Sequence, residues 1–182
     1  RVCRAGHLPG RLKYSVSFKR RVLEKCRHLI PVNADMVPTL FGRDGTNRCP
    51  PSTVVPAGID MKMFHPRDRL KSRRTLGWSE DDPYFFFPYK PGIPGKRIDL
   101  ARLAVERYSG NGRNAHLITG GNIPHEIIPD VICASNAVLA LSDYEASPTI
   151  VKESLACEIP VISTDVGDVR SSYGHLDGIL LC

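Results

Sequence analysis

The sequence predicts an open α/β fold in which helices cover both faces of a parallel sheet. Three observations support this prediction. From residue 53 onward, short apolar runs alternate with stretches of helical periodicity. The apolar runs are continuous, which is typical of strands that are buried on both faces. Clusters of Gly, Pro and Asn separate the runs and mark turns. Layered α/β structures are built from such alternation.

The first part of the chain has a different character. Apolar residues recur with helical spacing over 15–30, which predicts a helix with a basic opposite side. A weaker helix is expected over 34–41, and residues 42–52 indicate a connector because they are rich in Gly, Pro and Asn. We therefore expect two parts, 1–52 and 53–182.

Downstream of residue 52 the expected elements follow in order. Strands are expected at 54–55, 84–87, 116–119, 137–141, 160–163 and 178–181, and helices at 67–76, 98–108, 127–134 and 149–157. No helix is expected after the last strand, so the domain is predicted to be incomplete at its C-terminus. No apolar run approaches the roughly 20 residues that a membrane-spanning helix needs.

The charge is distributed unevenly. Residues 1–75 contain 17 Lys and Arg against 5 Asp and Glu, whereas residues 76–182 contain 8 against 14. The basic first part is compatible with nucleic acid or an anionic membrane as partner. Aromatic residues for base stacking are sparse there and no nucleic-acid motif is present, so nucleic acid is not favoured.

The cysteine pattern indicates a reducing compartment. The six cysteines include no Cys-x-x-Cys pair and are at least 23 residues apart, so neither a compact zinc site nor a small disulfide scaffold is indicated. The first residues lack the apolar stretch of a secretory signal. We therefore expect free thiols and a cytoplasmic location, with peripheral contact at the inner face of the membrane as an option.

Three loops at the expected carboxyl ends of strands have the polar character of a ligand site. In the loop after 137–141, Ser147 and Pro148 predict the N-cap and first position of a helix. Glu145 before that cap and Glu153 in the helix could meet one ligand, or could be an ordinary loop charge and a helix-surface charge. Residues 88–97 carry Lys90, Lys96 and Arg97 around a Pro/Gly turn that suits a diphosphate, or is a solvated turn.

The third loop is 120–124. Gly120 and Gly121 allow close approach of a ligand to the backbone, although they match neither the dinucleotide glycine fingerprint nor the P-loop. Alone, this loop is weak evidence for a site.

A resemblance to the family 4 glycosyltransferases, which are retaining enzymes of GT-B fold, is carried by EASPTIVKESLACEIPVISTDVGDV. The family signature has two glutamates separated by seven residues, here Glu145 and Glu153, followed by a small-Cys-x-x-Pro-Val-x-x-Thr-Asp-Val-Gly run. Upstream, VVPAGIDMKMFHP resembles the start of the family's donor-binding domain, and IPHEIIPDVICASNAVLALS resembles the stretch before the glutamates. The similarity spans roughly residues 54–181.

The resemblance implies a Rossmann-like donor-binding domain, one half of a GT-B fold, truncated at both ends. Residues 1–52 would then be a remnant of the acceptor-side domain. It also implies a hexosyltransferase-type enzyme of carbohydrate biosynthesis, which moves a sugar from a UDP- or GDP-linked donor to an unknown glycan, lipid or small-molecule acceptor. No cofactor and no obligatory metal are expected. This chain alone is expected to be inactive if the acceptor domain is missing.

The resemblance also assigns roles to residues. Glu145 would contact the donor sugar, Glu153 the ribose, and Lys96 and Lys90 the diphosphate. The backbone at 147–150 would hold sugar or phosphate, and the loop at 123–124 would lie against the base. The predicted site is thus catalytic at Glu145, Lys96 and Lys90, and donor-binding at Glu153, Ser147, Pro148, Thr149, Ile150, Gly120, Gly121, Ile123, Pro124 and Arg97.

Two departures from the family leave an alternative open. Ala146 stands where the family commonly has Gly, and Ala is strained if the backbone there needs a positive φ. Lys90 stands where the family usually has Arg, and a point charge grips phosphate less well than a fork of donors. The alternative is therefore a module that binds nucleotide-sugars without transferring them; a basic module for nucleic acid or anionic membranes is a lesser one.

Overall fold

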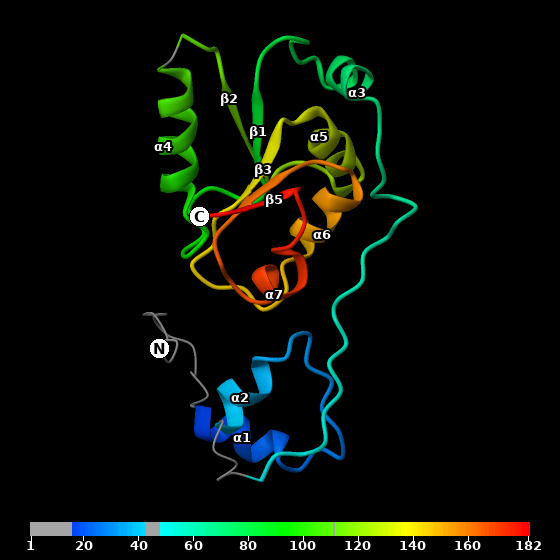
Figure 1. Ribbon diagram of the computed structural model, residues 1–182, viewed down its shortest axis with the longest axis vertical. Helices are drawn as coiled ribbons and strands as arrows, with labels where there is room; N and C mark the ends of the chain where they lie inside the picture. The colour runs from blue at the N-terminus through cyan, green and yellow to red at the C-terminus, as the bar shows by residue number, and fades with distance from the viewer. Residues whose placement is uncertain (1–15, 43–47, 111) are drawn as a thin grey trace. The chain divides into compact units, whose positions relative to one another are not determined.

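The computed structural model describes residues 16–42, 48–110 and 112–182, which form two units that we describe separately (Figure 1). The first unit ends at Pro56 and the second begins at Ala57, whereas the sequence predicts a boundary at 52/53. The amide of Val55 donates to the carbonyl of Pro31, 2.9 Å away, so residues 53–56 remain with the first unit. Residues 1–15 and 43–47 of the expected first part lie outside the described residues.

The first unit contains two short helices, α1 (Val16–Leu23) and α2 (Met36–Phe41). The helix predicted over 15–30 ends early because Leu29 pairs with Ser52 in a parallel bridge. The Leu29 amide donates to the carbonyl of Pro51 at 2.9 Å. The second half of the predicted helix is therefore not helical: a turn at residues 24–25 and a bend at residue 27 lead to the bridge at Leu29.

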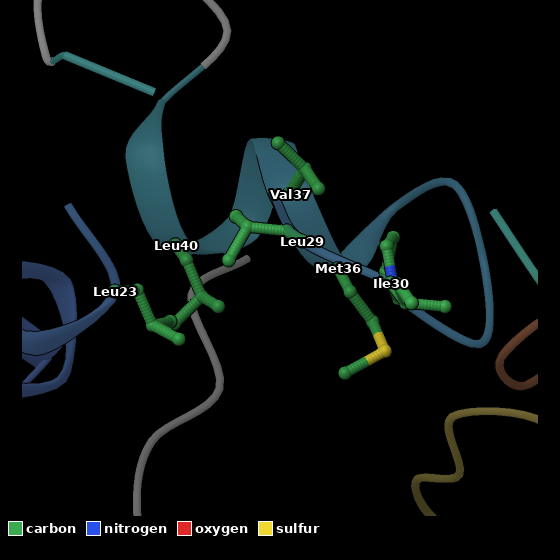
Figure 2. A pocket seen from close by; sticks show the side chains of 7 residues that line it. Leu23, Leu29, Ile30, Met36, Val37 and Leu40 are labelled. Atoms are coloured by element: carbon green, nitrogen blue, oxygen red, sulfur yellow. The ribbon is translucent and has the colours of Figure 1, made fainter. Parts of the chain in front are cut away.

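An apolar hollow of about 170 Å³ lies within the first unit (Figure 2). Its lining consists of Leu23, Leu29, Ile30, Pro31, Met36, Val37 and Leu40.

The strand expected at 54–55 is wrong, since Val54 and Val55 belong to no strand and are both exposed.

The second unit is built on a five-stranded parallel sheet with the order β2-β1-β3-β4-β5. The strands are β1 (Tyr84–Phe87), β2 (His116–Thr119), β3 (Ala137–Ala140), β4 (Val161–Ser163) and β5 (Ile179–Leu181). The helices are α3 (Arg69–Leu76), α4 (Ile98–Ser109), η1 (His125–Ile127, 3₁₀), α5 (Ile128–Ala134), α6 (Thr149–Ala156) and α7 (Val169–Tyr173). The predicted α/β fold class is confirmed; α7 was not predicted.

Helices cover both faces of this sheet because successive strand residues point to opposite sides. Phe86 of β1 packs in a core with Val138 of β3 and with residues of α5 and α6. Phe87 packs on the other face with Ala101 and Val105 of α4. Figure 1 shows α4 on one side of the strands and α3, α5 and α6 on the other. In the described part of the chain, every helix is too short or too polar to cross a membrane.

A cluster at the amino ends of β1 and β2 ties α3 to the sheet. The guanidinium of Arg73, a residue only 4% exposed, donates to the carbonyls of Ala134 and Glu80 and to Asn136 Oδ1. The same Asn136 oxygen accepts the amide of Tyr84 at 2.8 Å. We call these residues, with His116 stacked on Tyr84, the amino-edge cluster.

Candidate functional site

The loops that follow β1 to β4 lie together at the carboxyl edge of the sheet, because all five strands are parallel. The loop after β1 contacts the loop after β3, since the amide of Asp143 donates to the carbonyl of Gly95 at 2.8 Å. The loop after β4 contacts it from the other side, where the Thr164 hydroxyl donates to the carbonyl of Ser142 at 2.6 Å. We call these loops, residues 88–97, 120–124, 141–148 and 164–168, the carboxyl edge.

Glu145 lies at the centre of a hydrogen-bonded group at this edge. Its Oε1 forms an ion pair with Lys96 Nζ, and accepts the hydroxyls of Tyr89 at 3.0 Å and Ser142 at 2.8 Å. The side chains of Glu145 and Lys96 are 19% and 22% exposed, so solvent screens this pair only partly. The structure thus brings together two of the three residues predicted to be catalytic.

Tyr89 contacts both members of that pair. Its ring lies under Lys96 Nζ at 4.1 Å from the centroid, while its hydroxyl donates to Glu145. Burial, with the nearby Glu145 carboxylate, raises the pKa of the Tyr89 hydroxyl well above its ordinary value. Tyr89 therefore stays protonated near neutral pH, donates to Glu145 Oε1 and helps to orient the carboxylate.

The N-terminus of α6 is held differently from the prediction. Pro148 occupies the N-cap position and Ser147 does not cap the helix. The Ser147 hydroxyl instead donates to Asp168 Oδ2 at 2.8 Å and accepts from Lys152 Nζ at 2.8 Å. Lys152 also donates to the carbonyl of Ala57 at 2.7 Å. The predicted cap is wrong because Ser147 has stronger, charged partners from the helix interior and from the loop after β4.

The backbone at the start of α6 remains suited to anions. The first amides of a helix have no acceptor within the helix and carry a partial positive charge. Thr149 is exposed at this end, whereas the side chains of Pro148 and Ile150 are buried. Pro148 and Ile150 can therefore serve a ligand only through the backbone.

Glu153, one turn further along α6, is half-buried, and its charge adds to the raised pKa of the Tyr89 hydroxyl. Burial raises the pKa of its carboxyl group, an effect that nearby His125 and the Thr149 hydroxyl partly oppose. No contact joins Glu145 to Glu153 in the described residues. Their binding of one ligand therefore stays a prediction.

The glycine loop packs directly against the loop after β1. The buried Gly120 donates its amide to the carbonyl of Phe87 at 2.8 Å, and a Cβ on Gly120 would overlap the carbonyl of Pro88. A Cβ on Gly121 would overlap the side chain of Lys90. The two glycines therefore let these loops touch, which is a structural reason for glycine in addition to the predicted contact with a ligand.

The remaining predicted residues have varied surroundings. The Lys90 side chain is exposed, and no hydrogen bond or ion pair joins its ammonium group to any described residue. Arg97 donates to Asp99 Oδ2 at 2.8 Å and to Asp143 Oδ1 at 3.1 Å, so its guanidinium is already neutralised. The Ile123 side chain packs against the core, and Pro124 is exposed at the start of η1. Lys90 is thus a more available cation for a phosphate than Arg97.

The structure answers the question about Ala146. Its φ is not positive, since Arg97 and Glu158 are the non-glycine residues with positive φ in the described part of the chain. The left-handed position belongs instead to Gly167, where a Cβ would overlap the carbonyl of Ala146. Alanine at 146 therefore causes no backbone strain.

Sequence reasoning missed several residues of this site, namely Tyr89, Ser142, Lys152 and Asp168. Ser142 and Lys152 lie in the segment that contains Glu145 and Glu153, and Tyr89 lies in the loop of residues 88–97. Their polar side chains within these two segments were the signal that could have identified them. Asp168 is 6% exposed, follows the Thr-Asp-Val-Gly run, and keeps Oδ1 buried without a hydrogen-bond partner. Among the described residues, no group of three or more His, Cys, Asp or Glu could hold a metal ion.

An open parallel sheet with a polar carboxyl edge defines a class of nucleotide-binding α/β domains. Comparison with known proteins is more specific. Residues 102–181 match the family model of the glycosyl transferases of group 1. TuaC of Bacillus subtilis, named as a teichuronic acid biosynthesis glycosyltransferase, is 29% identical over 147 residues, covering 71% of this chain and 37% of TuaC. A D-inositol 3-phosphate glycosyltransferase of Geodermatophilus obscurus is 26% identical over 90% of this chain and 44% of its own length.

Solved structures agree on the fold. Sucrose-phosphate synthase from Thermosynechococcus elongatus has a TM-score of 0.70 at 19% identity, over 97% of this chain and 50% of that one. HepE from Anabaena, solved with UDP, has a TM-score of 0.69 at 13% identity, over 92% of this chain and 53% of that one. The resemblance to glycosyltransferases of GT-B fold is thereby confirmed. The chain spans about half the length of these relatives or less, and membership of family 4 stays a prediction.

Proposed function

We propose that this chain provides the donor-binding domain of a retaining glycosyltransferase. The domain would bind a UDP- or GDP-linked sugar at the carboxyl edge, and the sugar would pass to a glycan, lipid or small-molecule acceptor. The single observation that carries the proposal is the Glu145 group, because it places a carboxylate, an ammonium and a phenol where parallel sheets bind nucleotides. HepE, a neighbour in fold, was solved with UDP and with UDP-glucose.

The proposed chemistry depends on charge. Bond cleavage leaves negative charge on the diphosphate, and fixed cations that stabilise it lower the barrier. Lys96 is held close to Glu145 and Lys90 is exposed beside the glycine loop, so a diphosphate between them would be contacted by two ammonium groups. The α6 N-terminus would add backbone amides, and Glu153 would accept the ribose hydroxyls.

Glu145 has two roles in this proposal, one in the ligand-free chain and one with the donor bound. In the ligand-free chain it neutralises Lys96, which would otherwise be a half-buried cation without a partner. With donor bound, the diphosphate would compete for Lys96, and Glu145 would remain fixed by Tyr89 and Ser142 next to the sugar. We also propose that no metal is obligatory, because the sequence contains no Asp-x-Asp motif.

Calorimetric titration of the chain with UDP- and GDP-sugars tests the proposal. We expect saturable binding, and we expect Glu153→Ala to weaken it by about 10- to 100-fold through loss of two charge-assisted hydrogen bonds. Glu106→Ala, an exposed glutamate of α4, is the matched control and should bind as the parent does. Equal affinity of the Glu153 variant and the parent would refute the ribose assignment.

A second candidate is a module that binds nucleotide-sugars without transferring the sugar. It is favoured by Lys90, whose single ammonium replaces the forked donor that the family usually has. Slow hydrolysis of the bound donor, followed as release of nucleoside diphosphate, separates the two candidates. Binding without any hydrolysis, in the presence of a supplied acceptor-side domain, would favour the second.

A further inference from the structure

Two exposed thiols of the first unit, Cys26 and Cys49, line the same hollow. Cys26 follows the end of α1, and Cys49 precedes the segment that pairs with Leu29. The hollow measures about 590 Å³. Its lining consists of Glu24, Lys25, Cys26, Arg27, Arg48, Cys49, Pro50 and Pro51. None of these residues belongs to the carboxyl edge of the second unit, so the proposed donor site does not explain them.

The two thiols precede the backbone pairing of the first unit by the same number of residues. Leu29 and Ser52 are partners in a parallel bridge, and in parallel pairing a step back along one segment matches a step back along the other. Cys26 and Cys49 each lie three residues before their bridge residue (29 − 26 and 52 − 49). The hydrogen bonds of this pairing join residues 29–31 to residues 51–55, and the amide of Cys26 donates to the carbonyl of Leu23 in the turn after α1. A disulfide joins residues whose Cα atoms are about 4.4 to 6.8 Å apart.

Side chains beside the bridge hold these segments together. His28 Nε2 and Thr53 Oγ1 are 2.9 Å apart, which adds a hydrogen bond to the backbone pairing. In the reduced chain each thiol contacts a backbone carbonyl near its own position, Cys26 that of Val22 at 4.0 Å and Cys49 that of Pro50 at 3.3 Å. Closing a disulfide therefore requires rotation of both side chains and adjustment of the backbone that precedes the bridge.

The charge of the hollow favours an anionic reactant. Three cationic side chains, those of Lys25, Arg27 and Arg48, line it together with one acidic side chain, Glu24. All three cations are exposed and form no ion pair with the described residues. Small disulfides such as oxidised glutathione are anionic at neutral pH, so the lining raises their local concentration.

We propose that Cys26 and Cys49 are a modification site, a thiol pair that closes to a disulfide by exchange with a small anionic disulfide. One thiolate attacks the oxidised glutathione, forms a mixed disulfide and releases one reduced glutathione. The second thiolate attacks the protein sulfur of that mixed disulfide and releases the second glutathione. Two thiols are oxidised, one glutathione disulfide is reduced to two thiols, and the two thiol protons pass to the leaving thiolates.

The closed disulfide would connect the end of α1 to residues 49–56, the last segment of the first unit. Loop closure between these positions restricts the unfolded chain, so the oxidised first unit should unfold less readily than the reduced one. The site shares no residue with the Glu145 group, so failure of the proposed donor binding would not affect this proposal.

The test is incubation of the full chain with oxidised glutathione, followed by mass spectrometry of a tryptic digest under non-reducing conditions. Cleavage after Lys25, Arg27, Arg48 and Lys62 gives a linked product of residues 26–27 and 49–62. We expect this product, with two thiols fewer in a denaturing thiol titration. Its formation should slow with rising salt when oxidised glutathione is the reactant, and much less with the uncharged disulfide of 2-mercaptoethanol.

Single variants make the outcome decisive. In Cys26→Ser and in Cys49→Ser the reaction should stop at the mixed disulfide, with one glutathione bound to the remaining thiol. Cys182→Ser removes an exposed thiol of the second unit and should form the linked product as the parent does. Glutathione retained on both Cys26 and Cys49 in the parent would overturn the proposal. So would a disulfide from either residue to another cysteine, or equal salt dependence with the charged and uncharged reactants.

Discussion

The two ends of the parallel sheet contain polar groups of similar composition but different organisation. In the amino-edge cluster, Arg73 is buried and each of its donor nitrogens has an acceptor, and the shared acceptor Asn136 also binds the backbone of β1. At the carboxyl edge, Lys90 has no partner among the described residues, and Asp168 keeps one oxygen without a hydrogen bond.

This difference separates a structural cluster from a candidate site. A polar network whose donors and acceptors are all satisfied fixes the geometry of the fold. A buried acceptor without a partner, such as Asp168 Oδ1, costs stability and persists where a ligand or a function compensates it, and an exposed cation such as Lys90 is available to a ligand. We therefore expect substitutions at the amino edge to change mainly stability, and substitutions at the carboxyl edge to change mainly donor binding and turnover.

The largest expected effect on stability is that of Arg73→Ala. It removes the three hydrogen bonds that the guanidinium donates and the packing of its buried side chain, and we expect a loss of about 3 kcal/mol in the free energy of unfolding, measured by urea denaturation. Arg74→Ala is the matched control, because Arg74 is exposed and pairs with Glu80 at the surface; its unfolding midpoint should equal that of the parent. An Arg73 variant as stable as the parent would show that the amino-edge cluster does not hold α3 on the sheet.

A smaller loss of stability and a large loss of turnover are expected for Lys96→Met. The Glu145 carboxylate keeps its hydrogen bonds from Tyr89 and Ser142, so the loss of unfolding free energy should be about 1 kcal/mol. Donor hydrolysis should fall by about 100-fold, since a charge that stabilises the leaving diphosphate is missing. Lys71→Met, at an exposed position of α3, should leave both quantities unchanged. Unchanged hydrolysis in the Lys96 variant would contradict its proposed role.

The smallest effect on stability is expected for Glu153→Gln, which should raise the stability at neutral pH instead of lowering it. Burial raises the pKa of Glu153 in the folded chain, so the folded state binds this proton more tightly than the unfolded state. The contribution of Glu153 to the free energy of unfolding is therefore largest at low pH, and it is lost as the pH rises through the raised pKa. Near pH 7 the glutamine variant should melt up to about 2 °C higher than the parent.

The parent and the Glu153→Gln variant should become equally stable as the pH falls below the ordinary pKa of glutamate. At every pH the variant should bind nucleotide-sugars more weakly than the parent. Differential scanning calorimetry at several pH values measures the first part and titration calorimetry the second. A variant that is less stable at neutral pH would mean that the Glu153 carboxylate stabilises the fold.

Local patterns in the sequence were sufficient for the sheet but not for the contacts at its carboxyl edge. The aromatic residues of β1 and the pattern of β2 before the two glycines predicted the bounds of both strands to the residue. Ser147 was assigned a local cap, because its partner Asp168 is 21 residues away and the intervening fold is not visible in a local pattern. For the same reason, the contacts of Tyr89 with Glu145 and of Leu29 with Ser52 could not be predicted.

The glycines of the carboxyl edge have a consequence for how this domain can diversify. Gly120 and Gly167 place main chain against main chain, at the carbonyls of Pro88 and Ala146. The relative positions of the loops therefore depend on the absence of two side chains, in addition to the side-chain contacts of Tyr89, Ser147 and Thr164. Exposed residues between these fixed points, such as Lys90, can be exchanged with the scaffold preserved, so the proposed donor site could be altered by a few substitutions.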